Sequence, residues 1–142
     1  MSFDLKIENN DLSINPDGTV KTVRDNEKLK QDIIKAILTP LGSNPFHQWY
    51  GSTLSQRTIG MALDAGHTEA EAQRAIQNTL TNLVALQKAQ ARTQFVSPGE
   101  TIASIQNVSV LRDDVDPRQW QIQVTVLTKQ LTTVEESFTL RV

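Results

Sequence analysis

The sequence lacks cysteine, has only two histidines and carries no excess of positive charge. Without cysteine, the chain has no disulfide bond, thiolate metal site or cysteine nucleophile. Fourteen Lys and Arg residues against 16 Asp and Glu residues give a formal net charge of -2. Such a balance excludes the broad basic surface on which binding to a run of phosphates depends. We therefore expect no nucleic-acid partner.

Long apolar runs are also missing. The longest are far shorter than the roughly 20 residues needed to span a bilayer. The first ten residues, MSFDLKIENN, carry charges where a signal peptide has an apolar core. We expect neither a membrane partner nor export by that route. With 142 residues, no repeat and no composition shift, the chain is predicted to form a single domain over residues 1–142.

Hydrophobic periodicity predicts an N-terminal hairpin followed by a helix. The turn of the hairpin is expected at Asn9-Asn10, after a strand whose half-buried face is formed by Phe3, Leu5 and Ile7. Asp25 is the expected N-cap of the helix, and Pro40 ends it because its ring excludes helical geometry just before it. The apolar positions of this helix recur four residues apart, at Leu29, Ile33 and Ile37.

The middle of the chain is predicted to be a loop, a short helix and then the longest helix. Residues 39–55 have loop composition, and residues 57–63 are expected to form a short helix closed by Gly66. Thr68 and Glu71 have capping-box spacing and predict the start of the long helix, which we expect to end near residue 92. Its apolar stripe is formed by Ile76, Leu80, Leu83 and Val84.

The last third of the chain predicts three strands. The first, from Ile102 to Val110, alternates imperfectly, which indicates a bulge between Ser104 and Asn107. An acidic turn at residues 113–117 leads to a strand with a strict period of two, from Trp120 to Val126. A final strand runs to the last residue. The predicted fold is α+β: an N-terminal hairpin, two main helices and a C-terminal three-stranded antiparallel sheet.

Catalytic, cofactor-binding and metal-binding residues are not predicted. His47 and His67 have no spacing to each other or to carboxylates that suits a metal ion. The serines lack the GxSxG context of a nucleophile, and the glycines match no phosphate-binding motif. A glycosidase needs two carboxyl groups across a cleft. Instead, Glu69 and Glu71 are interpreted as dipole partners of a helix N-terminus, and Glu135 and Glu136 as the solvated side of the last strand.

The loop LTPLGSNPFHQWYGSTL, residues 38–54, is rich in aromatic residues. Phe46, Trp49 and Tyr50 lie within five residues of one another. Large rigid side chains of this kind anchor protein interfaces, and they also plug the cores of small domains. Both interpretations stay open, and on the first of them these three residues form a partner-docking loop.

The end of the chain is the second candidate for partner binding. A strand that runs to the final residue leaves one edge of unpaired backbone groups unless another element covers it. A neighbouring protein's strand would find main-chain hydrogen bonds there. The residues that we assign to this partner-binding strand are Val134, Glu136, Phe138, Leu140 and Val142.

In its order of elements, the chain resembles the small baseplate wedge protein of contractile phage tails, the sheath-initiator family. The resemblance rests on FDLKIENNDLSI, on Gln31-Asp32-Ile33 leading into the aromatic loop, and on the long helix and closing strands that follow. In the loop, the family pattern is matched at Leu38-Thr39, Gly42, Trp49 or Tyr50, Gly51-Ser52 and Leu54. Two family features differ here: Ser43 stands where a Glu is frequent, and of a Glu-Pro-Arg triplet only Glu100 is matched, so that the arginine is absent.

This resemblance implies a structural protein of the virion that assembles in the host cytoplasm, without a cofactor. It implies copies in a ring around the tail tube at the baseplate, with wedge proteins, hub proteins and the tail sheath protein as partners. It also implies a C-terminal sheet like the handshake domain of the sheath subunit, on which the first sheath ring assembles by strand exchange. Two alternatives stay open: a peptidoglycan-degrading, lysozyme-like enzyme that uses Trp49, Tyr50 and scattered acids, and a dimer that pairs its terminal strands.

Overall fold

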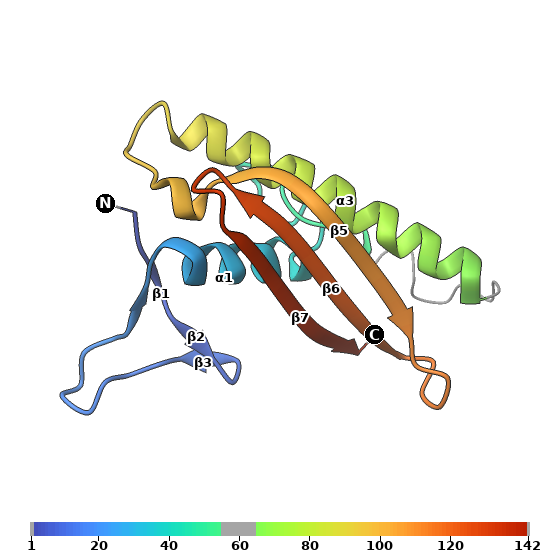
Figure 1. Cartoon of the computed structure of the whole chain (residues 1–142). Helices are drawn as coiled ribbons and strands as arrows, with labels where there is room; N and C mark the ends of the chain where they lie inside the picture. Colours follow the sequence, from blue (N-terminus) through green and yellow to red (C-terminus); the bar gives the residue numbers. More distant parts are fainter. Residues whose placement is uncertain (1, 55–64, 142) are drawn as a thin grey trace.

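A computed structural model describes residues 2–54 and 65–141, with side chains given for 2–54 and 68–141. Helices α1 (Asp25–Leu38) and α3 (Ala65–Gln90) cover one face of a three-stranded sheet (Figure 1). The strands of this sheet are β5 (Ile102–Arg112), β6 (Gln119–Thr128) and β7 (Thr133–Arg141), in the order β5-β6-β7. The predicted α+β fold, with its two main helices and antiparallel C-terminal sheet, is confirmed.

The sheet has one apolar and one polar face because its central strand alternates strictly. Even-numbered residues of β6 are buried against the helices, whereas Gln121 and Gln123 on the other face are exposed. β6 and β7 pair without interruption from Gln119↔Arg141 to Leu127↔Thr133. β5 pairs with β6 through two register shifts, between Ile102 and Ser104 and between Ile105 and Asn107. The predicted bulge is therefore confirmed, and a second irregularity accompanies it.

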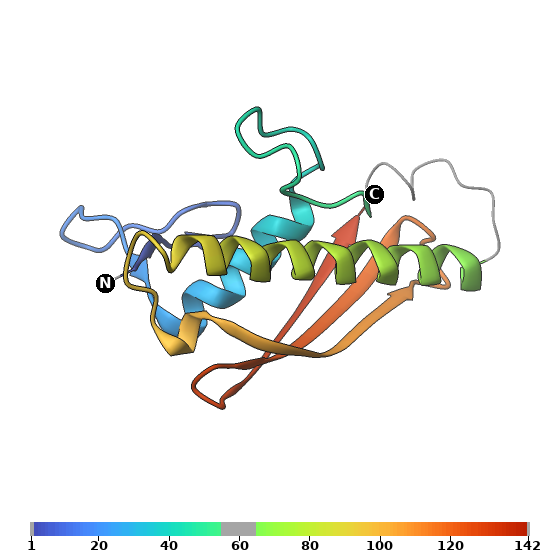
Figure 2. The same ribbon diagram turned by 90° about the horizontal axis from the view of Figure 1, so that it is seen from above.

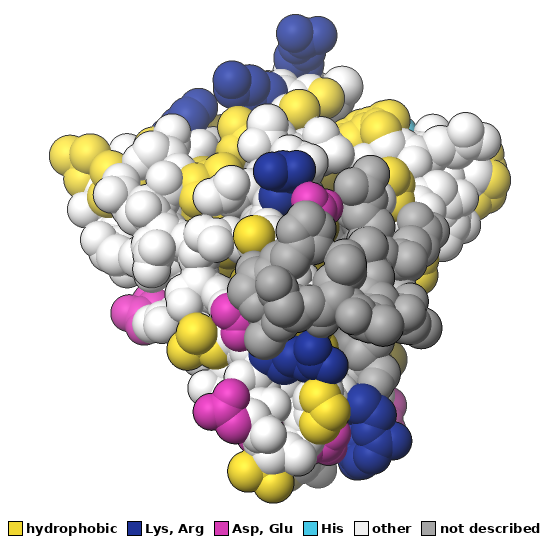
Figure 3. Space-filling view, turned by 90° about the vertical axis from the view of Figure 1, so that its right-hand side faces the viewer, with side chains coloured by type: hydrophobic (Ala, Val, Ile, Leu, Met, Phe, Trp, Pro, Cys, Tyr) yellow, Lys and Arg dark blue, Asp and Glu magenta, His cyan; other side chains and the backbone are white. Residues whose placement is uncertain are grey.

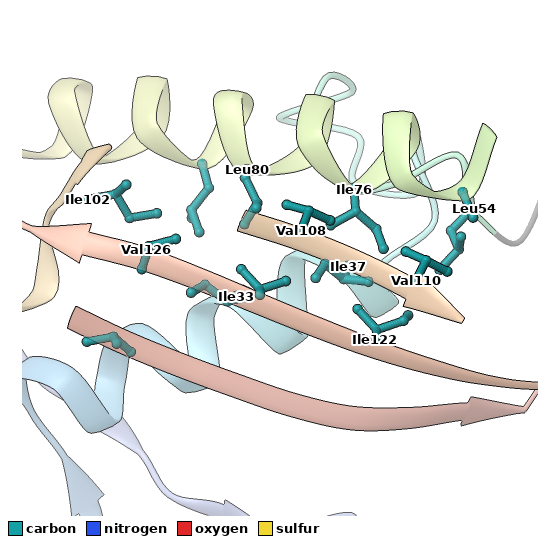
Figure 4. Close-up of a cluster of buried hydrophobic side chains, with 14 of the residues drawn as sticks. Ile33, Ile37, Leu54, Ile76, Leu80, Ile102, Val108, Val110, Ile122 and Val126 are labelled. Atoms are coloured by element: carbon teal, nitrogen blue, oxygen red, sulfur yellow. The ribbon is translucent and has the colours of Figure 1, made fainter. Parts of the chain in front are cut away.

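The hydrophobic core lies between the apolar face of the sheet and the two helices (Figure 4). The side chains of Leu29 and Ile33 from α1 and of Ile76 and Leu80 from α3 are at most 1 % exposed. They pack against the central strand, where Ile122, Val124 and Val126 are fully buried. The apolar stripes that the sequence predicts for both helices are thus the stripes that form the core.

Helix α3 is the longest element, with 26 residues and a length of about 39 Å. It crosses α1 and the sheet, and its polar last turn contains Lys88. Figure 2 shows the loop that follows α1 and the β6–β7 turn on opposite sides of the two helices. The molecule therefore offers two separate surfaces, the loop on one side of the helical layer and the sheet on the other.

Both helix starts differ from the prediction. Arg24, not Asp25, is the N-cap of α1, and it makes no side-chain capping bond; the carboxylate of Asp25 accepts a hydrogen bond from the Ser97 hydroxyl instead. Helix α3 begins at Ala65, so Thr68 and Glu71 lie inside it and Gly66 belongs to it rather than closing an earlier helix. The predicted short helix at 57–63 lies outside the described residues.

The N-terminal segment forms a two-part arm of short strands. β1 (Asp4–Leu5) pairs with β4 (Thr22–Val23), and β2 (Ile7–Glu8) pairs with β3 (Asp11–Leu12). Asn9 and Asn10 both have positive φ, of 52° and 64°, which is the geometry of a type I′ hairpin turn. The predicted hairpin is confirmed.

The orientation of this arm is the reverse of the prediction. The strand was expected to bury its apolar face, but Phe3, Leu5 and Ile7 are 56 %, 42 % and 48 % exposed. The polar face points inward because α1 offers polar partners: Gln31 donates to the Asp4 carboxylate and to the Leu5 carbonyl, and Lys35 pairs with Asp4. Alternation identifies two faces but not which of them the rest of the molecule covers.

Candidate functional site

The two ends of the loop after α1 are hydrogen-bonded to each other. The amide of Ser52 donates to the carbonyl of Thr39 at 2.8 Å, and the amide of Leu41 donates to the carbonyl of Ser52 at 2.9 Å. Gly51 has φ of +115°, and a Cβ there would lie 2.6 Å from the Thr39 carbonyl oxygen. Thr79 on α3 donates to the Gly51 carbonyl. The two ends of the loop are thus held together and fixed to α3, and Gly51 is required for that close approach.

The tip of the loop carries the predicted aromatic residues. Phe46 is 88 % exposed and Trp49 is 42 % exposed, while Tyr50 is half-buried. The rings of His47 and Trp49 meet edge to face, with centroids 5.7 Å apart. The alternative that all three aromatic residues plug the core is wrong, because none of them belongs to the buried cluster. Phe46 and Trp49 instead present apolar surface to solvent.

A polar cleft of about 420 Å³ lies beside this loop, between α1, α3 and the N-terminal arm. Its lining includes Asp4, Asp32, Lys35, His47 and Tyr50. Burial raises the pKa of the Tyr50 phenol above its usual value. Burial also acts to raise the pKa of Asp4, but hydrogen bonds from Lys35 and Gln31 outweigh it and hold that pKa below its usual value.

Neither aspartate of this cleft is suited to act as a general acid. A glycosidase acid must keep its proton near neutral pH, which requires a raised pKa. Asp4 has a lowered pKa, and Asp32 accepts from Lys28 at 2.8 Å and pairs with Lys35 at 3.1 Å. Lysines pair with both carboxylates. The geometry matches an ion-pair network that joins the N-terminal arm to α1.

Glu100, the remaining acid that the family resemblance singles out, is 1 % exposed. One carboxylate oxygen accepts from the Ser97 amide at 3.1 Å, in the capping box of the 3-10 turn η1 (Pro98–Glu100). The other oxygen has no hydrogen-bond partner, and Lys28 Nζ lies 3.9 Å from it. A carboxylate this deep has no access to a polysaccharide, so its evident role is to hold the turn after α3 against α1.

The free edge of β7 is the second candidate surface. Because the Thr128 amide donates to the Thr132 carbonyl, even-numbered residues of β7 point their amides toward β6. The amides and carbonyls of the odd-numbered residues therefore point away from the sheet, at Thr133, Glu135, Ser137, Thr139 and Arg141. No hydrogen bond between described residues occupies these groups.

The opposite edge of the sheet is protected. Gln73 of α3 donates to the Val108 carbonyl at 2.8 Å, and Glu69 accepts from the Arg112 amide at 3.0 Å. Gln87 accepts from the Ile102 amide at 2.9 Å. Three side chains of one helix thus satisfy outward backbone groups of β5. The interpretation of Glu69 and Glu71 as helix-dipole partners is wrong, because α3 begins at Ala65 and its first turn contains no acid. The bulges of β5 disturb the remainder of that edge.

A groove of about 670 Å³ lies between the N-terminal arm and α1 and reaches β7 at Glu136, and we call it the edge groove. One wall is formed by the N-terminal hairpin, which lies on the β7 side of the sheet in Figure 1. The floor is the outer side of α1, where Ile34 and Leu38 supply apolar surface. The charged residues of the lining are Lys6, Glu27, Lys30, Lys35 and Glu136.

The sequence analysis placed Glu136 on the solvated side of β7, and this interpretation is wrong. Glu136 occupies the same face as Val134 and Phe138 and is half-buried, whereas Glu135 points outward and is exposed. Burial raises the pKa of the Glu136 carboxyl, with a smaller opposing effect from Lys30. Val134 is buried and Phe138 and Leu140 pack against the core; Val142 lies outside the described residues.

The described part of the face drawn in Figure 3 has no single dominant charge. Figure 3 shows basic, acidic and hydrophobic side chains interspersed on one face. Among the side chains described, His, Cys, Asp and Glu form no group of three or more placed to bind a metal ion; the prediction for His67 lies outside these side chains. Within residues 2–54 and 65–141, every helix is too short or too polar to span a bilayer.

Comparison with known proteins gives a family and a solved structure of similar fold. Residues 1–90 match the family model described as contractile injection system sheath initiator. A solved structure from Geobacter sulfurreducens, of a protein provisionally named a tail lysozyme, aligns with a TM-score of 0.59 and 10 % identity. The alignment covers 82 % of this chain and 89 % of that one, and at this identity it shows the fold alone. No curated protein sequence matches.

Proposed function

Because the chain belongs to the sheath initiator family of contractile injection systems, and so has a structural role in a contractile tail, we propose a specific way in which it acts. It sits in the baseplate around the tail tube, docks to wedge or hub proteins through the aromatic loop, and starts the sheath by accepting a strand at β7. In this role it is an assembly protein without catalytic activity.

The free edge of β7 is the observation that carries this proposal. Nine consecutive residues of β7 pair regularly with β6, so the edge is straight enough to accept another strand along its length. Natural monomers normally blunt such an edge, as this protein does at β5. Main-chain hydrogen bonds at the outward amides supply affinity, and the alternating side chains over the edge groove supply register.

A proline on the free edge tests strand addition. Ser137→Pro removes an outward amide but no hydrogen bond to β6, so the sheet should keep its fold while baseplates carrying the variant start few or no sheaths. Sheath length is measured by electron microscopy, with circular dichroism as the check on folding and Ser137→Ala as the matched control. Full sheaths on folded Ser137→Pro baseplates would refute strand addition. Truncation at Glu136 is less informative, since it also removes Phe138 and Leu140 from the core.

The loop is tested separately. Phe46→Ala combined with Trp49→Ala removes exposed apolar surface without touching the core, so the variant should fold normally. If the loop docks to wedge or hub proteins, the variant should be lost from assembled baseplates, because buried aromatic anchors dominate interface energies. The matched control is Phe95→Ala, which also removes an exposed aromatic side chain, 68 % exposed, outside the loop. Equal incorporation of both variants would assign the loop no docking role.

The lysozyme-like alternative has one observation in its favour, the name given to the protein of similar fold. It predicts release of soluble fragments when the purified chain is incubated with peptidoglycan. Asp32→Asn is the sharper control than a change at Glu100, because Asp32 lines the polar cleft and Glu100 is enclosed. Turnover that disappears in Asp32→Asn would replace the structural proposal with an enzymatic one.

A further inference from the structure

We propose that Glu136 selects the strand that β7 accepts, by requiring a lysine or arginine of the partner beside it in the edge groove. This inference rests on the proposed function, since it concerns the same edge. It adds the chemistry of the partner, which neither the family nor the fold specifies.

The position of Glu136 is unusual for an acid. Its cross-strand partner is Val124, which is fully buried, and its neighbours on the same face of β7 are Val134 and Phe138. An inward-pointing charge on an edge strand is a device that prevents indiscriminate pairing of sheet edges. An apolar strand added beside β7 would cover this carboxylate and leave it without a counter-ion, which is costly.

The lysines near Glu136 are already engaged. Lys30 Nζ lies 3.6 Å from the Glu27 carboxylate, Lys35 pairs with Asp4 and Asp32, and Lys6 lies 3.7 Å from Glu8. Among the described residues, Glu136 is in no ion pair, although burial raises the pKa of its carboxyl. The edge groove therefore contains, at Glu136, an acid without an ion-pair partner among the described residues, and a cation from outside is its natural partner.

The rest of the groove defines the residues around that cation. In a strand that pairs with β7 in either direction, the residue opposite Glu136 points its side chain toward α1. Residues two positions to each side point the same way, and the groove that Glu136 lines also contains the apolar side chains of Ile34 and Leu38. The partner is thus an extended segment of the pattern apolar, any residue, Lys or Arg, any residue, apolar. A second copy of β7, paired so that its own Glu136 lies opposite, brings another glutamate to this position and is repelled.

Two synthetic peptides test the selection. Both alternate Val and Thr, end in Pro to limit their own aggregation, and differ only in a central Lys or Glu on the Val face. Binding to the full chain is measured by NMR, using the amide signals of Ser137 and Thr139 at the free edge. We expect the Lys peptide to bind about tenfold more tightly than the Glu peptide. Glu136→Lys should reverse the preference, whereas the matched control Glu135→Lys, on the outward face, should not.

The outcomes separate this inference from the proposed function. Binding of both peptides with equal affinity would overturn the selection by Glu136 and leave strand addition intact. A preference that follows Glu135 rather than Glu136 would also overturn it. Binding of neither peptide at the free-edge amides would remove the strand-addition proposal and this inference together.

Discussion

The two edges of the sheet differ in what happens to their outward backbone groups. At β5, two bulges break the register and three side chains of α3, Glu69, Gln73 and Gln87, hydrogen-bond to the outward backbone. At β7, the register is regular, and no described residue bonds to the outward backbone groups. From this second strand, Glu136 reaches the edge groove.

This difference determines which edge can accept a partner's strand. An unpaired strand edge is a risk for any protein that must stay monomeric before assembly. The protein removes that risk at β5 with side chains of α3 that hydrogen-bond to the outward backbone groups. At β7 it keeps a milder protection, the inward carboxylate of Glu136. One edge is closed permanently, whereas the other is closed to most strands and open to a suitable one.

The largest effect is expected from a change that destabilises the whole sheet and therefore both of its edges. Ile122→Ala in β6 truncates a fully buried side chain of the strand that both edges share. We expect a loss of about 2 to 4 kcal/mol in the free energy of unfolding, because the cavity adds to the lost burial. Urea denaturation measures this change. Gln121→Ala, on the exposed face of the same strand, is the matched control, and an equal loss in both variants would contradict the assignment of the core.

A smaller effect is expected when the protection of β5 is weakened. Gln87→Leu leaves the Ile102 amide and the Glu100 carbonyl without their partner in a site where Gln87 is 4 % exposed. Unpaired buried backbone groups should lower the free energy of unfolding by about 2 kcal/mol. Gln77→Leu, an exposed residue of the same helix, is the control for helix propensity and should change little. A Gln87→Leu protein as stable as this control would show that the Gln87 bonds do not protect the edge.

Much of the sheet was predictable because a period of two is a strong local signal. The strict alternation from Trp120 to Val126 predicted both faces of β6, and the defect between Ser104 and Asn107 predicted a bulge. The protection of β5 was not predicted, since it depends on helix residues far away in sequence. One signal was present: Gln87 follows Ile76, Leu80 and Leu83 at helical spacing, and a polar residue in an apolar stripe requires a buried partner.

The candidate site was predictable in its parts but not in its arrangement. The aromatic loop and the terminal strand stood out by composition and alternation. The edge groove was not predictable, because one of its walls is the N-terminal arm. The apolar face of this arm is exposed, since its polar face pairs with α1 through Asp4. Glu136 was grouped with Glu135 as solvated, although the alternation that puts Val134 and Phe138 inside also places Glu136 there.

The smallest effect concerns the pH dependence of stability at the open edge. Burial raises the pKa of Glu136 in the folded state, with Lys30 opposing and Glu27 assisting. Folding therefore favours the protonated acid: this contribution to stability is fully present below the ordinary pKa of glutamate and is lost as the pH rises through the raised value. Glu136→Gln has no such loss. Its free energy of unfolding, relative to the unchanged protein, should rise between about pH 4 and about pH 7. The rise should be only about 0.5 kcal/mol, because solvent screens a half-exposed charge.

Denaturation curves across this range measure the difference, with Glu135→Gln on the outward face as control. A gain that is the same at both ends of the range would mean that the Glu136 charge costs the unbound edge nothing, and the contrast between a closed and a selectively open edge would then rest on backbone geometry alone.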